Sequence, residues 1–417
     1  MHMQAVGVIV EYNPFHNGHK WHIEAAKEQS GCSFVIAVMS GNFVQRGEPA
    51  ILDKWTRAEM AIRGGADLII ELPVVFAVRS AQYFAEGGIR LLHALGIVKQ
   101  VCFGAENADL KLLNQLAAAT NDAYIIKQLH ANLQRGNTYA AALGSALENQ
   151  YHIPAGIINS PNNILAVEYL RAIQKFAPEL QPIAITRQGS KFHDTAIDSP
   201  FASATAIRQA ILEHLAITSE LTSALPETTV TILSKALAEK RGPVTLSHFS
   251  SIILAQLRTM RFKDLEHLPS ISEGLHRKIR DSSLIAQNLE QLLRLLKSKR
   301  YPYTRLQRIL VHSLLGTTQE QLTAFDQQGP SYARILAFNH KGRLLLKELA
   351  HASTVPLITK TTHFLTSKKR DASGLTPLQE MLAIDTVASD LYSLGIPSSR
   401  WNMGAWDFRH SALYIPT

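Results

Sequence analysis

Two histidines near the start of the chain could stabilise negative charge on a phosphate. His16 and His19 bracket an Asn-Gly pair that follows an apolar run, Ala5–Val10, typical of a buried strand. Residues 20–27 are typical of a helix, so the histidines stand where a strand turns into a helix. At such a turn the free N–H groups and the helix dipole attract phosphate, and Gly18 lets the backbone approach a ligand closely. Both imidazoles could donate to phosphate oxygens that gain charge as a phosphoryl bond breaks, so they are the candidate catalytic residues.

The same histidines also allow a metal site. His16, His19 and His22 are three residues apart, and side chains at i and i+3 share one face of a helix. A zinc site usually recruits further ligands from a distant segment, and the sequence contains neither an H-E-x-x-H motif nor paired C-x-x-C motifs. We therefore predict a phosphate site and no metal ligand, with a metal site and a plain surface turn as the alternatives.

Length and composition indicate a folded chain of two or more domains. Its 417 residues are 46% hydrophobic and 18% charged, which are ordinary values for a globular protein. No apolar run is long enough to span a bilayer, and no signal peptide precedes the first strand. Cys32 and Cys102 are the only cysteines, too few for a disulfide framework. We therefore expect a cytoplasmic protein that does not enter a membrane.

The net charge is concentrated in the second half of the chain. Residues 1–210 contain 17 Lys and Arg against 17 Asp and Glu, whereas residues 211–417 contain 25 against 17 and so carry the whole formal charge of +8. A basic region beside a neutral one favours a polyanionic partner, most simply RNA. Mild basicity is also common among soluble proteins, so the charge supports an RNA partner without requiring one.

Strands and helices are predicted to alternate along the first half. The strand candidates are short apolar runs, as expected for strands buried on both faces of a parallel sheet. We expect a doubly wound, Rossmann-like α/β sheet, in which ligands bind beyond the carboxyl ends of the strands. The predicted strands are residues 5–10, 33–39, 68–72, 100–103 and 182–186, and the predicted helices are residues 19–29, 54–63, 81–95, 109–134, 138–149 and 163–176.

Strand signals fade in the second half. Residues 211–350 are predicted to be mostly helical, residues 355–365 to hold one more strand, and residues 376–395 to form an amphipathic helix. We expect a nucleotide-binding catalytic domain over residues 1–215 and a mostly helical, basic, RNA-binding region over residues 216–417.

A polar loop follows the second predicted strand. Residues 40–50 contain two glycines, a proline and several polar side chains, and a loop of this kind at a strand end usually lines a site. Arg46 could hold a phosphate or a carboxylate through two hydrogen bonds, and Gln45 could bind a substrate. Lys54 and Arg57, in the helix that follows, are candidates to face a ligand or RNA, with plain exposure to water as the alternative.

Other polar positions at strand ends could contact a nucleotide. Gly104 closes the fourth predicted strand and permits a flat approach by a nucleoside. Arg187 ends the fifth strand, where its charge suits a phosphate, although a surface role is the alternative. Asn162 precedes a helix and could recognise adenine or simply cap that helix.

A second helix start could complete a phosphate cradle. Ser203 and Thr205 can cap a helix, and their hydroxyl and N–H groups can hold the β- and γ-phosphates of a nucleotide. Arg208 lies one turn further and adds positive charge. The alternative is an ordinary capped helix. No K-M-S-K-S run is present, which argues against a tRNA synthetase of that class.

Two clusters of cations in the second half could bind RNA. In the first cluster tyrosines stand among the cations, and tyrosine can stack on an unpaired base while lysine and arginine hold phosphates. A solvated charged face is the alternative for each cluster. The candidates are Lys297, Lys299, Arg300, Tyr301 and Arg305 in the first cluster, and Lys368, Lys369 and Arg370 in the second.

Several long tracts resemble one family, the bacterial tRNA(Met) cytidine acetate ligases. These ligases belong to the H-x-G-H nucleotidyltransferase superfamily, whose members split ATP between its α and β phosphates. The match runs in one order over nearly the whole chain, and Ala204 stands where many superfamily members have serine. The tracts are residues 10–19, 39–50, 70–73, 103–106, 161–165, 202–208 and 298–305.

The resemblance implies that ATP, with Mg²⁺, converts acetate to acetyl-adenylate. The N4 amine of the wobble cytidine of elongator tRNA(Met) then takes the acetyl group, which gives N4-acetylcytidine, and no obligate protein partner is implied. By position, the ATP contacts of the family fall on Ile9, Val10, Glu11, Tyr12, Asn13, Pro14, Phe15, His16, Asn17, Gly18, His19, Lys20, Trp21, His22, Gly104, Asn162 and Arg187.

Two rival functions share parts of this sequence pattern. A small-molecule nucleotidyltransferase, which joins a nucleotide to a phosphorylated metabolite, would share the first half but leave the basic second half unexplained. An RNA-binding protein that has lost catalysis is the other rival, and the intact H-x-G-H and S-x-T-x-I-R segments argue against it.

Overall fold

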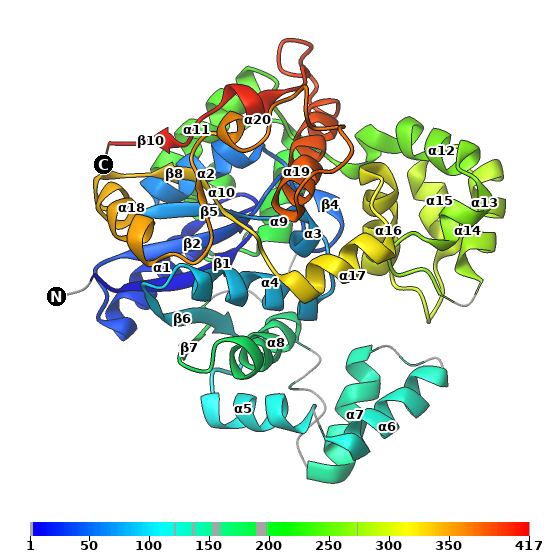
Figure 1. Cartoon of the computed structure of the whole chain (residues 1–417), viewed down its shortest axis with the longest axis horizontal. Coiled ribbons are helices and arrows are strands. Elements are labelled where there is room, and N and C mark those ends of the chain that lie inside the picture. The colour runs from blue at the N-terminus through cyan, green and yellow to red at the C-terminus, as the bar shows by residue number, and fades with distance from the viewer. Residues whose placement is uncertain are drawn as a thin grey trace.

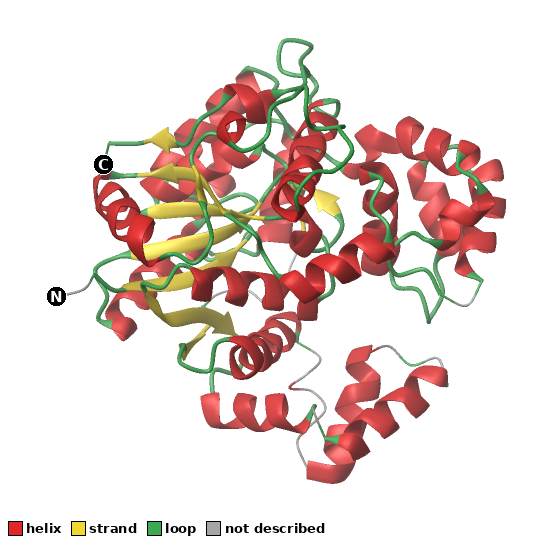
Figure 2. Ribbon diagram, viewed as in Figure 1, coloured by secondary structure: helices red, strands yellow, loops and turns green. Residues whose placement is uncertain are grey.

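One eight-stranded sheet organises the protein (Figures 1 and 2). The computed structural model describes residues 3–416 except 121, 136, 138, 152–156, 158–159, 189–196, 198 and 273. The strand order is β10-β8-β5-β2-β1-β6-β7, and β9 pairs with β8 beside this path. The strands are β1 (Ala5–Val10), β2 (Val35–Ser40), β5 (Leu68–Leu72), β6 (Val98–Ala105), β7 (Gln181–Thr186), β8 (Ala333–Phe338), β9 (Leu357–Ile358) and β10 (Leu413–Tyr414).

The doubly wound arrangement predicted for the first half is confirmed. Strands β1, β2, β5, β6 and β7 are parallel, and helices cover both faces of the sheet. The helices α1 (Asn17–Ser30) and α2 (Lys54–Arg63) pack in the core on one face, and α4 (Ala81–Ala94) and α8 (Pro161–Phe176) pack in the core on the other. This topology brings the carboxyl ends of the central strands to one edge, where the polar loops begin.

One long predicted helix is two helices in the structure. The predicted helix over residues 109–134 is divided into α5 (Leu110–Ala119) and α6 (Ala123–Gln134). The division has a local cause, because the side chain of Asp122 accepts a hydrogen bond from the N–H of Tyr124 and so caps a new helix. The next helix is α7 (Tyr139–Tyr151), and residue 138, where it was predicted to begin, lies outside the described residues.

The second half of the chain returns to the sheet at a point where the sequence predicts mostly helix. The predicted helical stretch over residues 211–350 contains β8, whose six residues pair antiparallel with β5. The strand expected within residues 355–365 is only the two-residue β9, followed by a 3₁₀ turn, Thr361–His363. Because β8, β9 and β10 all join the sheet, the predicted boundary at residue 215 does not separate the sheet from the rest of the chain.

The helices of the second half lie in three places in Figure 1. Helices α9 to α11 lie behind the sheet, α12 to α16 form a lobe beside it, and α17 to α20 return to the sheet and the helices that cover it. The helix predicted at residues 376–395 is α19. The helices are α9 (Ala204–His214), α10 (Ser219–Ala224), α11 (Glu227–Ala238), α12 (Ser250–Thr259), α13 (Phe262–Glu266), α14 (Leu275–Ile285), α15 (Leu289–Leu296), α16 (Tyr303–Leu315), α17 (Gln319–Gln328), α18 (His340–Ala352), α19 (Pro377–Ser393) and α20 (Trp406–Arg409).

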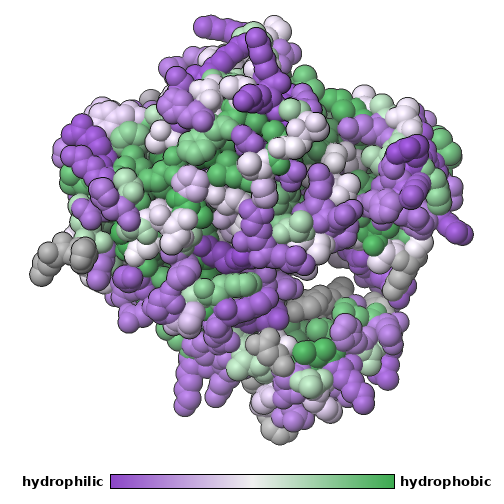
Figure 3. Space-filling model, viewed as in Figure 1, coloured by the Kyte–Doolittle hydropathy of each residue, from purple (hydrophilic) through white to green (hydrophobic). Residues whose placement is uncertain are grey.

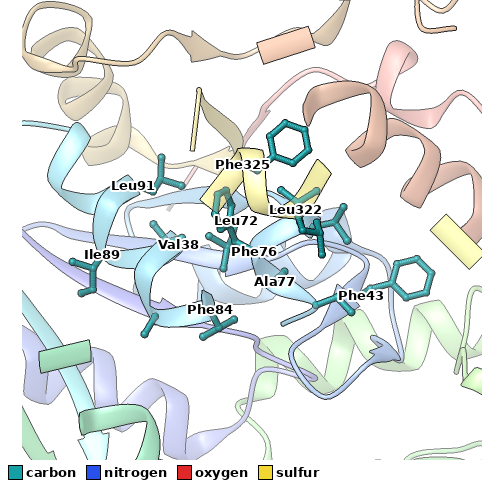
Figure 4. Packing of buried hydrophobic residues seen from close by; sticks show 14 of the residues in the cluster. Val38, Phe43, Leu72, Phe76, Ala77, Phe84, Ile89, Leu91, Leu322 and Phe325 are labelled. Carbon is teal, nitrogen blue, oxygen red and sulfur yellow. The ribbon is translucent and has the colours of Figure 1, made fainter. Parts of the chain in front are cut away.

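A shared apolar core joins the two halves. Figure 4 shows Leu322 and Phe325 of α17 beside Leu72, the last residue of β5, and Phe76 of α3 (Val74–Ala77). All four side chains are at least 97% buried. None of the helices in the described part of the chain is both long and apolar enough to cross a bilayer.

A buried histidine next to this core allows the pH dependence of the free energy of unfolding to be tested. His312 of α16 contacts the hydroxyl of Thr317 through Nδ1 and the carbonyl of Val78 through Nε2, both at 2.8 Å. Burial, followed by the charge of Arg79, lowers its pKa to about 3. The unfolded chain, with an ordinary pKa of about 6.5, takes up the proton first as pH falls. The histidine therefore stabilises the fold fully above that pH, and this contribution is lost as pH falls toward 3.

We expect the His312→Gln variant to depend less on pH than the parent protein. Between pH 7 and pH 5 the parent should lose about 2 kcal/mol more of its free energy of unfolding than the variant does, since glutamine does not titrate. Denaturant unfolding of both proteins at the two pH values measures this difference. Equal losses in the two proteins would contradict the assignment.

Candidate functional site

The turn from β1 into α1 holds both histidines in fixed positions. His16 is the N-cap of α1, and its Nδ1 accepts a hydrogen bond from the N–H of Gly18 at 3.1 Å. The N–H of His16 donates in turn to Nδ1 of His19 at 3.3 Å. The two rings stack with their centroids 3.6 Å apart. Each ring is thus fixed by the backbone of the helix start that would receive the phosphates.

These hydrogen bonds also decide which ring nitrogen carries the proton. Because Nδ1 of each ring accepts a hydrogen bond, the N–H of the neutral imidazole is on Nε2. Burial, followed by the nearby cations Arg187 and Arg208, lowers the pKa of His16 to about 3. Burial also holds the pKa of His19 well below its usual range. Both imidazoles are therefore neutral at pH 7 and present Nε2–H donors.

Tyr12 closes the other side of the turn. It has a positive backbone φ of 49°, a conformation that is uncommon for a bulky residue and marks local strain. Its ring is fully buried and meets the rings of Phe15 and His19 edge-on, at 4.9 and 4.8 Å between centroids. The aromatic contact thus supports the imidazole of His19 from behind.

Most other residues of the predicted ATP-binding segment shape the turn. Pro14 and Phe15 are buried, and Asn13 accepts a hydrogen bond from the N–H of Ile51 through its side chain. The side chain of Asn17 donates to two backbone carbonyls, those of Pro200 and Ser223. Ile9 and Val10 are the last residues of β1, and the side chain of Glu11 accepts a hydrogen bond from the N–H of Gln45. In α1, Lys20 is exposed, and Trp21 and His22 are half-buried.

The start of α9 brings the second predicted phosphate segment to the same turn. Ser203 is its N-cap and accepts from the N–H of Ala206 at 3.0 Å. Arg208 donates to the carbonyl of Asn13 at 3.1 Å and to the hydroxyl of Thr205 at 3.3 Å. Burial lowers the pKa of Arg208, and the guanidinium keeps its charge at neutral pH. The structure thus brings together the two segments that the sequence places about 190 residues apart.

A third group forms at the ends of β6 and β7. Arg187 donates to the side-chain carbonyl of Asn162 at 3.4 Å, and Asn162 donates to Glu106 at 2.6 Å. Glu106 also accepts from the N–H of Asn163 at 3.0 Å. A Cβ atom at Gly104 would come within 3.1 Å of the Arg187 side chain, so glycine keeps this surface flat. Glu106 and Asn163 are not among the predicted site residues, although Glu106 directly follows β6 in the structure.

The polar loop after β2 is folded into a small hairpin, β3 (Phe43–Val44) and β4 (Glu48–Pro49). Gln45 uses its side-chain amide to donate to the carbonyl of Arg79 at 3.1 Å. Arg46 lies half-buried at the hairpin tip. A Cβ at Gly47, whose φ is 79°, would clash with the backbone of α16, so the loop lies tight against the second half of the chain.

Lys54 and Arg57 do not face a substrate, which corrects the sequence prediction. Both side chains are fully buried. Lys54 lies between Glu71 and Asp407, at 2.8 and 3.0 Å. Arg57 donates to backbone carbonyls of the loops that follow β1 and β2, including that of Ser40 at 3.1 Å. The two residues brace the site from within the protein, and a bound RNA cannot reach them.

The first cationic cluster is exposed except around Tyr301. Lys297, Lys299 and Arg300 are exposed beyond the end of α15, and hydrophilic side chains cover much of this lobe in Figure 3. Tyr301 is only 8% exposed, and its hydroxyl donates to the carbonyl of Ser272 at 3.3 Å. The prediction that Tyr301 stacks on a base is therefore wrong, because its ring is packed inside the lobe.

The remaining cations of the two clusters differ in the contacts that their side chains make. Arg305 lies over the ring of Tyr301 at 5.1 Å and donates to the carbonyl of Ser270 at 2.9 Å. In the second cluster Lys368 and Lys369 are exposed, whereas Arg370 pairs with Asp390 at 2.5 Å. Lys368 and Lys369 thus remain candidate phosphate contacts, and Arg370 holds its own loop.

The described residues contain no group of three or more His, Cys, Asp and Glu side chains that could hold a metal ion. His22 contacts the sulfur of Cys102 at 3.7 Å through Nε2. Burial, and then the charge of Arg187, lowers the pKa of His22 to about 4. The side chain of His22 therefore points toward the sheet. In the described part of the chain, no group of side chains would form a zinc site with His16, His19 and His22.

Comparisons with known proteins give one consistent result. The family profile of HIGH Nucleotidyl Transferase matches residues 3–404. The chain is 41% identical over 418 aligned residues to the tRNA(Met) cytidine acetate ligase of Thermoanaerobacter sp. strain X514, covering 99% of this chain and 100% of that protein. It is 40% identical to the protein of the same name from Caldanaerobacter subterraneus, with the same coverage.

Two solved structures resemble the whole chain. The apo crystal structure of Thermotoga maritima TmcAL superimposes with a TM-score of 0.92 at 33% identity, and covers 100% of both chains. The crystal structure of the same protein bound with alpha-thio ATP gives a TM-score of 0.89 at 32% identity, again over 100% of both chains. The entire fold is therefore shared with a protein that binds an ATP analogue.

Proposed function

Since the chain belongs to the HIGH nucleotidyl transferases and, within them, to the tRNA(Met) cytidine acetate ligases, we propose that it acetylates the wobble cytidine of elongator tRNA(Met). ATP and acetate form acetyl-adenylate, and N4 of the cytidine then takes the acetyl group. One observation carries the proposal. The two neutral imidazoles at the start of α1, flanked by Arg187 and Arg208, form a cradle for phosphate charge in a chain that matches these ligases over its full length.

The first step needs charge stabilisation and no side-chain nucleophile. Acetate is ionised at neutral pH, and its oxygen attacks the α-phosphorus of ATP while the bond to the bridging oxygen of pyrophosphate breaks. The Nε2–H groups of His16 and His19 and the guanidinium of Arg208 are placed to stabilise the leaving pyrophosphate. In the second step N4 attacks the acetyl carbon, AMP leaves, and N4 loses a proton.

The nucleotide contacts remain a proposal built on this geometry. The phosphates fit the turn at residues 9–22 and the start of α9, where Ser203, Thr205 and Arg208 lie. The adenosine fits the surface at Gly104, Asn162 and Arg187. Mg²⁺ is proposed to bind beside the phosphates, where Glu11, the residue after β1, brings a carboxylate to the turn. The ion would neutralise part of the phosphate charge.

The proposed location is the cytoplasm. The RNA substrate is found there, and Cys32 and Cys102 are both free thiols, which fits a reducing compartment.

Lys299 and Arg300 are proposed to contact tRNA phosphates. We expect the double variant Lys299→Ala/Arg300→Ala to bind tRNA more weakly and to lower the slope of log affinity against log salt by about one to two. Binding measured from 50 to 300 mM salt, a range chosen to span physiological ionic strength at about 150 mM, gives this slope. The matched control is Lys347→Ala, an exposed lysine of α18 on the far side of the molecule from this lobe in Figure 1. An unchanged slope in the double variant would remove both residues from the RNA surface.

An assay with isotopically labelled acetate tests the proposed function. The protein is incubated with unmodified tRNA, ATP, Mg²⁺ and labelled acetate, and the nucleosides are analysed by mass spectrometry. We expect labelled N4-acetylcytidine that requires ATP. If folded protein gives none, the ligase function is wrong. An ATP–pyrophosphate exchange that requires a phosphorylated metabolite in place of acetate would then indicate the rival small-molecule transferase.

A further inference from the structure

A cavity lies between α2, α19 and α20, and no residue of the phosphate cradle lines it. The space in the cavity and in the open solvent at its mouth amounts to about 480 Å³. Three of the four tryptophans of the chain line it, namely Trp55, Trp401 and Trp406, together with His410. None of these residues belongs to the nucleotide site described above.

The aromatic rings form a continuous stack. Trp401 stacks on Trp406 at 5.5 Å, Trp406 on His410 at 4.7 Å, and His410 on Trp55 at 5.7 Å, with interplanar angles between 21° and 30°. Flat, nearly parallel rings that line a cavity are suited to a planar aromatic ligand, because base–aromatic stacking depends on the π-face alone.

The cavity also offers polar groups to the edge of such a ligand. The indole Nε1–H of Trp406 is buried and has no hydrogen-bond partner among the described residues. An unmet buried donor is costly, so an acceptor on a ligand would stabilise it. Asn42 and Asp53 line the same cavity, and burial tends to raise the pKa of Asp53, but the charge of Arg241 and the hydrogen bonds of Thr56 hold it below its ordinary value.

Two arginines lie against the Trp401 ring of the cavity. The guanidinium of Arg241 lies 4.6 Å above the Trp401 ring and pairs with Asp53 at 2.9 Å. Arg400 is exposed and lies 5.5 Å from the centre of the same ring. An aromatic cavity with arginines beside its rings has the chemistry of a site for a nucleobase that is attached to phosphate.

One loop connects this cavity to the nucleotide site. Asn42 and Asp53, at the two ends of the loop after β2, line the cavity. Between them, the N–H of Gln45 donates to Glu11 at 2.8 Å, and the N–H of Ile51 donates to Asn13 at 2.9 Å. A polynucleotide held at the cavity would therefore lie one loop away from the turn that is proposed to bind ATP.

We propose that this cavity, named here the tryptophan cavity, binds an unpaired nucleobase of the RNA substrate. The base packs against the aromatic rings that line the cavity, accepts a hydrogen bond from Nε1 of Trp406, and leaves its phosphates to Arg241 and Arg400. The inference rests on the proposed function for the identity of the RNA. It adds a recognition site outside the cationic clusters.

Two variants and two assays test the proposal. Trp401→Ala removes one half-buried ring, and Trp406→Phe keeps the stack while it removes the unmet N–H donor. For each variant, the affinity for unmodified tRNA(Met) transcript and the acetate-dependent ATP–pyrophosphate exchange are measured. Tyr414→Ala is the matched control, because Tyr414 is an aromatic residue of the same C-terminal region, 48% exposed on β10.

We expect Trp401→Ala to weaken tRNA binding by roughly tenfold to a hundredfold, the loss typical of one stacked base, and Trp406→Phe to weaken it by a smaller factor. The exchange reaction and the control should remain within twofold of the parent protein. Affinity for tRNA within twofold of the parent in both variants would overturn the proposal. Absence of acetate-dependent exchange in the parent protein would instead overturn the proposed function.

Tryptophan fluorescence distinguishes an RNA base from a free nucleotide. A hairpin RNA with the tRNA(Met) anticodon loop should quench the emission of the parent protein and quench that of Trp401→Ala less. Quenching by AMP or CMP that depends on Trp401, without quenching by the hairpin, would overturn the assignment to RNA and indicate a mononucleotide.

Discussion

Replacing His16 or His19 by alanine should reduce acetate-dependent ATP–pyrophosphate exchange by at least about a hundredfold, the usual cost of one donor to a developing oxyanion. Each imidazole contributes an Nε2–H to the proposed pyrophosphate site, fixed by a backbone hydrogen bond to its Nδ1. The affinity for tRNA should stay within twofold of the parent, because these residues lie outside the proposed RNA surface. Isotope exchange and tRNA binding, measured on the same preparations, give both values.

A second substitution separates chemistry from helix capping. His16 also caps α1, so alanine removes a cap together with a donor. His16→Asn retains a good N-cap residue but lacks the ring donor. We expect His16→Asn to fold as stably as the parent and to remain strongly impaired in exchange. Near-normal turnover in His16→Ala or His16→Asn would show that the imidazole is not needed for adenylate formation.

The second large effect concerns stability. A buried network of charges joins β5, β8, α2 and α20: Arg334 lies 2.8 Å from Asp407 and 3.2 Å from Glu71, and Lys54 contacts both carboxylates. All four side chains are at most 4% exposed. Burial alone would raise the pKa of Asp407, but Arg334 and Lys54 hold it well below its usual range.

Arg334→Met should therefore lower the free energy of unfolding by about 3–5 kcal/mol, because it leaves buried carboxylates without a full set of partners. Denaturant unfolding measures this loss. The control is Arg63→Met, which removes the surface pair with Glu59 at 2.9 Å and should change stability by less than about 1 kcal/mol. Equal effects of the two substitutions would show that the buried network adds nothing beyond an exposed pair.

The parallel part of the fold could be predicted because its signals are local. The runs at Ala5–Val10 and Leu68–Leu72 are short and apolar, and both are strands with the predicted bounds. Ala333–Phe338 is also a short apolar run, but it stands among helices and pairs with a strand more than 260 residues earlier. Pairing with a strand so distant in the sequence gives no signal in the residues around Ala333–Phe338. The sequence therefore predicts helix over this segment, where the structure has β8.

The residues of the candidate site also differ in how far the sequence predicts their positions. His16 and His19 follow a strand within a few residues, and the long tracts around them make the motif specific, so their position at a helix start could be predicted. Lys54 and Arg57 show the limit, since a charged residue in a polar segment gives no sign of whether it is buried. The carboxylate partners of Lys54 are 17 and 353 residues away, and only the folded chain brings them together.

The antiparallel pairing of β8 with β5 has a consequence for synthesis on the ribosome. The first 215 residues emerge early, yet β5 then lacks a neighbour on one edge, and Lys54 and Glu71 lack Arg334 and Asp407. An open edge with buried charges beside it is unstable and prone to pair with another chain. The sheet that carries the proposed ATP site is therefore completed only when nearly the whole polypeptide has been made. A ribosome-bound fragment is not expected to consume ATP before the part of the chain proposed to recognise RNA is present.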